Sequence, residues 1–294
     1  MVSKKRMQSE RQIGQLATIL LIGAFFLSAC SSFTDRVSKR PEDIKALSEA
    51  RELISILENQ NRELKAFKGV GRITFWKNNK KDLASNIAWV ASAPDRLRVV
   101  LRSISGQPIV SFANDGQLFY LFSHAQGQFY KKPATNSTLK KLLSVPIKSD
   151  DIVDILAGRV PVNKHNSAVL IKSAPSRRTP ANASQQQVNR FNPGETCVPE
   201  DGYILVLKKG WGKIHEKIYL DANKKDVRMV EMFGLTGALA YRAEFSGMQK
   251  IKGYKVPFRL VLSNDDGSGF QLDVDRFWAD VSVSSSMFVL TPPE

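Results

Sequence analysis

The sequence predicts a mainly β, α+β fold: one strongly curved antiparallel sheet of about eleven strands, with helices covering its concave face. Most of the chain from Val70 to Val274 alternates apolar and polar residues with a period of two, which is typical of strands with one buried and one wet face. Apolar residues at helical spacing precede this stretch and interrupt it once. A sheet of that size tends to curl, and its apolar concave face needs a cover. The helices are the expected cover.

An amphipathic helix is expected before the sheet, over residues 41–67. Pro41 suits the first turn of a helix, and Glu42 and Asp43 suit its positive end. Apolar residues then recur at helical spacing: Ile44, Leu47, Ile54, Leu57 and Leu64. One face of this helix therefore needs an apolar surface, most simply the domain that follows.

The expected strands fall into two groups. Residues 136–144 and 150–156 between them have helical spacing, and Gly158 follows the second helix. The second group of strands begins at Tyr203. Residues 174–200 are rich in Ser, Pro, Asn and Gln and hold almost nothing that could pack, so they are expected to form a disordered insertion or a long loop.

The N-terminus has the layout of a secretory signal over residues 1–29. Basic residues precede an apolar run over 16–27, and two small residues then lead to Cys30. Leu27-Ser28-Ala29-Cys30 resembles the lipobox of bacterial lipoproteins, in which the cysteine is acylated and becomes the mature N-terminus. A helix that crosses a membrane needs roughly 20 apolar residues, more than this run supplies. A signal anchor that stays in the membrane and an ordinary buried cysteine are the alternatives.

If Cys30 is lipidated, the mature chain divides into a tether, a helix and one domain. Residues 30–40 form a lipidated tether, the amphipathic helix follows, and residues 68–294 form one domain that contains the insertion. The lipobox implies three acyl chains, and each buried CH₂ contributes about 0.8 kcal/mol, so anchoring would be permanent. Residue 31 is serine rather than the aspartate that retains lipoproteins at the inner membrane of enteric bacteria. The expected address is the outer membrane, facing the periplasm.

Charge favours acidic envelope surfaces over nucleic acid. Cleavage before Cys30 removes four cations and one anion from a formal net charge of +15, which leaves +12. An exported chain rarely meets nucleic acid, and no recognition motif is present. Anionic lipid head groups or other acidic envelope polymers fit better. The alternative is a solvated basic surface without a specific partner.

The sequence contains no recognisable catalytic constellation, so a non-enzymatic role is expected. His124, His165 and His215 are scattered singly, without a carboxylate or cysteine at metal-ligand spacing. Asp273 and Asp275 share one strand face but alternate with apolar residues, which indicates the solvent face of a strand. A hydrolase of acidic glycans is a further alternative, but it would need paired catalytic carboxylates that these positions do not supply. Once Cys30 carries lipid, the only other cysteine has no partner for a disulfide.

The order of elements resembles the LolA/LolB-like periplasmic lipoprotein carriers, and LolB most closely because of the lipid anchor. The resemblance covers residues 70–162: Gly71-Arg72-Ile73, Ser85 to Trp89, Asp95 to Leu101, Ser103-Ile104-Ser105-Gly106, Pro108-Ile109-Val110, and Ile152 to Pro161. It implies an unclosed antiparallel β-barrel with helices across its mouth. The barrel's apolar cavity would hold the acyl chains of lipoproteins in transit, without a cofactor.

The resemblance also implies partners and a membrane-insertion loop. LolB accepts a lipoprotein from the soluble carrier LolA and inserts it into the outer membrane with the help of a leucine that protrudes from a turn. Here the turn contains Ile104, Ser105 and Gly106. Ser105 stands in the place of the leucine, and Ile104 is the nearest apolar candidate, so the insertion step is the point at which this chain departs from the pattern.

Inward-facing positions of the predicted strands are the candidates for the cavity wall: Ile73, Phe75, Ile87, Trp89, Leu97, Val99, Leu101, Tyr241, Phe258 and Leu260. The alternative is that these residues form a closed core. Two functions thus stay open. One is an acyl-chain-binding lipoprotein that receives lipoproteins from a LolA-like carrier. The other is a structural or regulatory envelope lipoprotein that binds a protein partner through the same fold.

Overall fold

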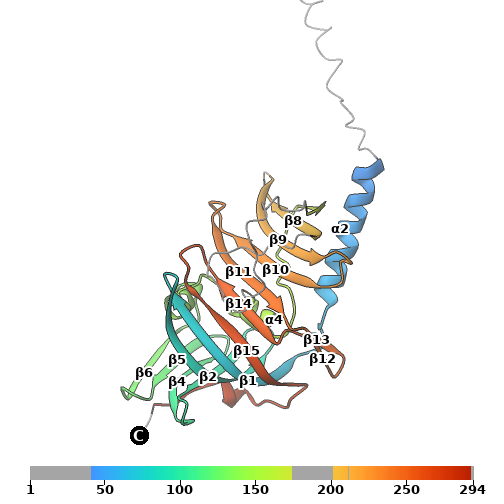
Figure 1. Ribbon diagram of the computed structural model, residues 1–294. Helices are drawn as coiled ribbons and strands as arrows, with labels where there is room; N and C mark the ends of the chain where they lie inside the picture. The colour runs from blue at the N-terminus through green and yellow to red at the C-terminus, as the bar shows by residue number, and fades with distance from the viewer. Residues whose placement is uncertain (1–40, 174–200, 211, 293–294) are drawn as a thin grey trace, which may run out of the picture. The chain divides into compact units, whose positions relative to one another are not determined.

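A large antiparallel sheet dominates the computed structural model, which describes residues 41–173, 201–210 and 212–292. Thirteen strands form it in the order β6-β5-β4-β3-β2-β1-β15-β14-β11-β10-β9-β8-β7, and Figure 1 shows how strongly it curves. The first six strands are β1 (Ala66–Lys77), β2 (Lys80–Ser92), β3 (Arg96–Arg102), β4 (Pro108–Asn114), β5 (Leu118–Ser123) and β6 (Gln128–Pro133). The others are β7 (Ser167–Lys172), β8 (Gly202–Lys209), β9 (Lys213–Asp221), β10 (Val227–Phe233), β11 (Leu239–Ser246), β14 (Arg259–Ser263) and β15 (Gly269–Ala279). The edge strands β6 and β7 do not pair with each other, so the sheet is unclosed.

The expected count of about eleven strands is too low. A separate pair, β12 (Gln249–Ile251) and β13 (Tyr254–Val256), adds a two-stranded sheet to the thirteen. The edge strand β6 is exposed at nearly every position, so it carries no apolar alternation. In β7, Val169 and Ile171 are apolar although exposed, so apolar residues occupy both faces and the sequence does not alternate. Alternation predicts a strand only where one face is buried and the other is wet, so it does not identify edge strands such as these.

Helix α2 (Pro41–Asn59) packs one face into the main hydrophobic core. Ala50, Leu53 and Leu57 are almost fully buried on that face. The helix ends at Asn59 and not at residue 67 as expected, because Asn61 adopts a left-handed conformation at φ 52° that stops the helical ladder. The predicted helical residue Leu64 is fully buried beyond the helix end.

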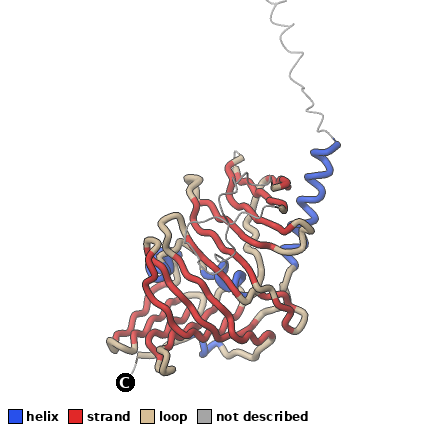
Figure 2. Tube along the Cα trace, viewed as in Figure 1, coloured by secondary structure: helices blue, strands red, loops and turns tan. Residues whose placement is uncertain are grey.

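Two short helices, α3 (Asn136–Leu143) and α4 (Ser149–Leu156), interrupt the strands, close to the expected ranges. Thr135 caps α3, since its side chain accepts a hydrogen bond from the backbone N–H of Thr138. The first turn of α4 carries Asp150 and Asp151, at the helix end that favours acidic residues. Figure 2 shows helical turns on the inner side of the curved sheet.

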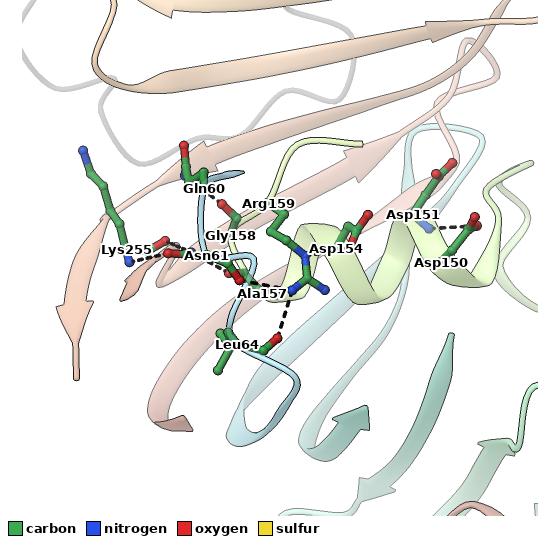
Figure 3. A network of polar contacts seen from close by, with 10 residues as sticks. All are labelled: Gln60, Asn61, Leu64, Asp150, Asp151, Asp154, Ala157, Gly158, Arg159 and Lys255. Carbon is green, nitrogen blue, oxygen red and sulfur yellow. Dashed lines mark hydrogen bonds and ion pairs between the residues drawn. The ribbon is translucent and has the colours of Figure 1, made fainter. Parts of the chain in front are cut away.

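A polar network ties the end of α4 to the segment that follows α2 (Figure 3). The Asn61 side chain donates to the carbonyl oxygens of Ala157 at 2.8 Å and Lys255 at 2.7 Å. Arg159 donates from Nε to Asp154 Oδ1 at 2.7 Å and from Nη1 to the carbonyl oxygen of Leu64 at 2.9 Å. The bond to Ala157 satisfies a carbonyl group that the end of α4 leaves free, and together the bonds tie α4 to the segment after α2 and to β13.

Candidate functional site

An apolar cavity of about 180 Å³ lies between the sheet and the two short helices. The sheet contributes residues from β1 to β5, β14 and β15: Ile73, Phe75, Ile87, Trp89, Leu97, Val99, Leu101, Val110, Phe112, Leu121, Leu260, Leu262, Phe270 and Leu272. The helices and the segment between them contribute Leu139, Leu143, Ile147, Ile152, Ile155 and Leu156. The lining residues are apolar apart from the indole N–H of Trp89, and none carries a charge, so a ligand held here gains mainly from burial.

Strand geometry explains why the lining positions recur every second residue. Side chains of a strand point alternately to the two faces, so Leu97, Val99 and Leu101 of β3 share the inner face. The register places Leu101 opposite Val110 of β4 and Leu101 opposite Ile87 of β2. Rows of apolar side chains therefore continue from strand to strand and form one wall.

The structure brings together eight of the ten residues predicted to line a cavity, and it separates two. Ile73, Phe75, Ile87, Trp89, Leu97, Val99, Leu101 and Leu260 line it. Tyr241 lies instead in the packed half of the core, where its hydroxyl donates to Asp151 Oδ2 at 3.0 Å. Phe258 precedes β14 and packs half-buried against the core. Alternation reports which face a residue takes, but it does not say which part of a long sheet faces the cavity.

Sequence reasoning missed most of the helical wall of the cavity. Leu139 and Leu143 lie on one face of α3, and Ile152 and Ile155 lie on one face of α4. Their helical spacing was visible in the sequence. Only the tertiary structure shows that these faces cover the strands β1 to β5 rather than the other half of the sheet.

Two buried carboxyl groups lie beside the cavity in the packed half of the core. The register aligns Glu216, Met232 and Tyr241 across β9, β10 and β11. Glu216 is fully buried, and its Oε2 accepts a hydrogen bond from the backbone N–H of Asn163 at 3.1 Å. Burial raises the pKa of Glu216 to about 8, and burial with the nearby Asp150 raises the pKa of Asp151 to about 6. Neither group lines the cavity, so the cavity itself stays apolar.

The signal for Glu216 was present in the sequence. It shares strand parity with Ile214, Ile218 and Leu220, so alternation assigns a carboxyl group to an inward position. A buried carboxyl group is expected to be neutral or paired. Here burial outweighs the hydrogen bonds from Asn163, which lower the pKa, and a pKa of about 8 favours the neutral form near pH 7.

The predicted insertion loop is a tight turn between β3 and β4. Ile104 is fully exposed at 101%, and Ser105 and Gly106 are exposed with it. The backbone N–H of Ser103 donates to the carbonyl oxygen of Gln107 at 2.8 Å, and that of Gly106 donates to Ser103 at 3.0 Å. Leu101 and Val110, at the base of this hairpin, both line the cavity. Three residues at no more than about 3.3 Å each put the backbone of Ile104 within roughly 10 Å of the cavity wall.

Solved structures that match this fold at a TM-score of 0.50 include a LolA superfamily protein. A LolA superfamily protein from Nitrosomonas europaea has 12% identity and a TM-score of 0.50, with 82% of this chain and 97% of that chain covered. A DUF1329 family protein from Desulfovibrio piger has 12% identity and a TM-score of 0.50, with 83% and 97% covered. A putative outer membrane lipoprotein-sorting protein domain from Vibrio parahaemolyticus has 12% identity and a TM-score of 0.43, with 84% and 97% covered. No protein-family model and no curated protein matches the sequence.

The chain therefore has a LolA/LolB-like fold, a mostly β architecture built on one large unclosed antiparallel sheet with few helices. At this level of identity the likeness concerns the fold. None of the helices among the described residues is long and apolar enough to cross a lipid bilayer. Cys30, the signal at 1–29, the tether at 30–40 and the insertion at 174–200 lie outside the described residues.

Proposed function

We propose that this chain is a non-enzymatic lipoprotein, anchored in the outer membrane through Cys30, that binds acyl chains in the cavity. It accepts lipoproteins from a LolA-like periplasmic carrier and inserts them into the outer membrane. The observation that carries the proposal is a cavity lined by uncharged and almost entirely apolar side chains within a LolA/LolB-like fold. Lipoproteins in transit carry acyl chains, and an apolar cavity takes such chains without directional bonds.

The size of the cavity sets how much of a ligand it holds at rest. An apolar cavity of about 150 Å³ stays dry and binds a molecule as small as benzene. The cavity here is similar, at about 180 Å³, so it takes a segment of one acyl chain. A longer chain requires the helical wall to move away from the sheet. Each square ångström of apolar surface buried then contributes about 25 cal/mol.

The position of the Ile104 turn supports the delivery step. Its fully exposed side chain lies at the tip of the hairpin whose base forms part of the cavity wall. An apolar side chain at this place contacts lipid when the hairpin reaches a membrane, and a released acyl chain then has a short path to the bilayer.

Mass spectrometry of bound lipids and acylated peptides tests the proposal. The sample is the chain from Ser31 onward, which keeps every described residue, expressed in the periplasm. We expect bound acyl chains or lipoproteins, and displacement of a fluorescent fatty-acid probe by them. An empty protein that keeps its β-rich fold and excludes the probe has a closed core, and the proposal then fails. A stoichiometric protein without lipid would favour the alternative of an envelope lipoprotein that binds a protein partner.

A pair of neighbouring substitutions links binding to the cavity. Val99 points into the cavity, while Val100 is the next residue on β3 and points to the other face of the sheet. Val99→Trp is expected to fill the cavity and to weaken probe binding about tenfold or more, the equivalent of roughly 1.4 kcal/mol. Val100→Trp is the matched control and should leave the affinity for the probe unchanged.

A further inference from the structure

Two hairpin turns of this chain share one backbone design and one exposed apolar side chain. In the β3–β4 turn, Ser103 N–H donates to Gln107 at 2.8 Å and Gly106 N–H donates to Ser103 at 3.0 Å. In the β10–β11 turn, Gly234 N–H donates to Ala238 at 2.8 Å and Gly237 N–H donates to Gly234 at 3.0 Å. The fourth residue is a glycine in both, with φ 85° and 86°. The second residue is Ile104 in one turn and Leu235 in the other.

The exposure of these two side chains sets them apart. Ile104 is 101% exposed and Leu235 is 91% exposed. Among the other large apolar side chains of the described ranges, the most exposed is Ile56, at 55%. At these exposed fractions neither side chain folds back onto the sheet.

The turn itself does not require an apolar residue at this position. A third turn, between β14 and β15, has the same pattern: Asn264 N–H donates to Ser268 at 3.0 Å, and Gly267 N–H donates to Asn264 at 3.3 Å. Its second residue is the exposed Asp265. This turn type needs glycine at the left-handed position and accepts most residues before it. Ile104 and Leu235 therefore serve something outside the turn.

Strand directions place all three turns along one edge of the sheet, namely the edge formed by the C-terminal ends of β3, β10 and β14 and not by an outermost strand. Every neighbouring pair is antiparallel, so β3, β10 and β14 run in the same direction and end at the same edge. The Ile104 and Leu235 turns are six strand spacings apart in the sheet order. At about 4.8 Å per spacing this is roughly 30 Å along the edge. Only an extended partner contacts both tips at once.

Charge at this edge identifies the kind of partner. The exposed cations of its turns and strand ends are Lys77, Lys80, Lys81, Arg102, Lys209 and Lys213. The exposed acids among the described residues there are Asp82, Asp265 and Asp266. Apolar tips on a net basic rim suit a lipid surface with anionic head groups, because the tips enter the hydrocarbon boundary and the cations stay among the head groups.

We propose that this edge of the sheet docks on the surface of a phospholipid bilayer, with the Leu235 turn as a second insertion point alongside the Ile104 turn. Docking at two separate points fixes how the edge faces the bilayer, whereas one tip alone leaves the domain free to rotate about it. The inference does not depend on acyl chains entering the cavity. It requires only a lipid surface.

Hydrogen–deuterium exchange of the full chain on vesicles tests this proposal. The vesicles contain phosphatidylethanolamine and phosphatidylglycerol, and the readout is exchange within residues 103–107 and 234–238 with and without vesicles. We expect slower exchange in both segments on vesicles. No slowing at 234–238, or slowing confined to 103–107, overturns the role of Leu235. Slowing that appears without vesicles as the protein concentration rises would mean that a second copy covers the edge, which also overturns the proposal.

Substitutions sharpen the test. Leu235→Asp is expected to abolish the slowing at 234–238, while the unfolding midpoint stays unchanged because Asp265 shows that the turn accepts an acid. Leu235→Phe should keep the slowing. Ile56→Asp, an exposed apolar position on α2, is the matched control and should keep it too. Exchange rates and unfolding midpoints are both measured without a fatty-acid probe. An empty cavity and a failure to dock are therefore distinguishable results.

Discussion

Gly69 lies directly opposite Trp89 in the register of β1 and β2, and a Cβ at position 69 would come within 2.1 Å of Trp89 Cζ2. The absence of a side chain on Gly69 thus sets the position of an indole that lines the cavity.

Gly69→Ala should displace the ring at a cost of about 1–3 kcal/mol in the free energy of unfolding. Urea denaturation measures this cost, and the displaced ring should also change the affinity for a fatty-acid probe. Thr74→Ala on the same strand is the control, and an equal loss of stability in both variants would contradict the explanation.

Glu216 should make stability depend on pH. Burial raises its folded-state pKa from 4.5 to about 8, so the folded state keeps a proton that the unfolded chain releases. The stabilisation is full below pH 4.5 and is lost as the pH rises toward 8, by about 1.4 kcal/mol for each pH unit crossed. Urea denaturation between about pH 5 and pH 9 measures the slope. Glu216→Gln, which stays neutral, should flatten it.

The exposed Glu58 on α2 provides the control for that titration. Glu58→Gln should leave the pH dependence of unfolding as it is in the unaltered chain. A Glu216→Gln variant with an unchanged slope would show that Glu216 is ionised in the folded state, stabilised there by its hydrogen bond from the backbone N–H of Asn163.

The Ile104 turn should matter for delivery and not for stability. Ile104→Asp is expected to impair transfer of bound lipid into vesicles, because an ionised side chain does not enter the hydrocarbon boundary. Its side chain is fully exposed, so the free energy of unfolding should change by no more than about 0.5 kcal/mol. Transfer of a fluorescent lipid from protein to vesicles measures the first effect. Transfer at the unaltered rate would mean that this turn is not an insertion loop.

Cys30→Ser tests the lipid anchor. Removing the sulfur removes the site of acylation, and the protein is then expected to leave the membrane fraction. Fractionation of cells followed by immunoblotting measures the change, with Cys197→Ser as the matched control. A Cys30→Ser variant that still sediments entirely with membranes would rule out acylation as the anchor.

Much of the fold was predictable because strand alternation is a local property. Each residue's face follows from its parity within a strand, which is why the sequence alone assigns Ile73, Ile87 and Leu97 to the inner face. The exposed turn at Ile104 was likewise visible, since turn chemistry depends on a few neighbouring residues. The edge strand β6 was not predictable, because a strand that is exposed on both faces has no period.

The extent of the cavity was decided only by the tertiary structure. β1 pairs with β15, so Ile73 lies opposite Leu272, far away in the sequence. Through such pairings the inner face encloses a cavity over β1 to β5, β14 and β15, while Tyr241 of β11 is buried outside that cavity and bonded to Asp151. Tyr241 and Val99 have the same local signature of an inward strand position. Contacts between distant segments separate them, and no local pattern of residues encodes such contacts.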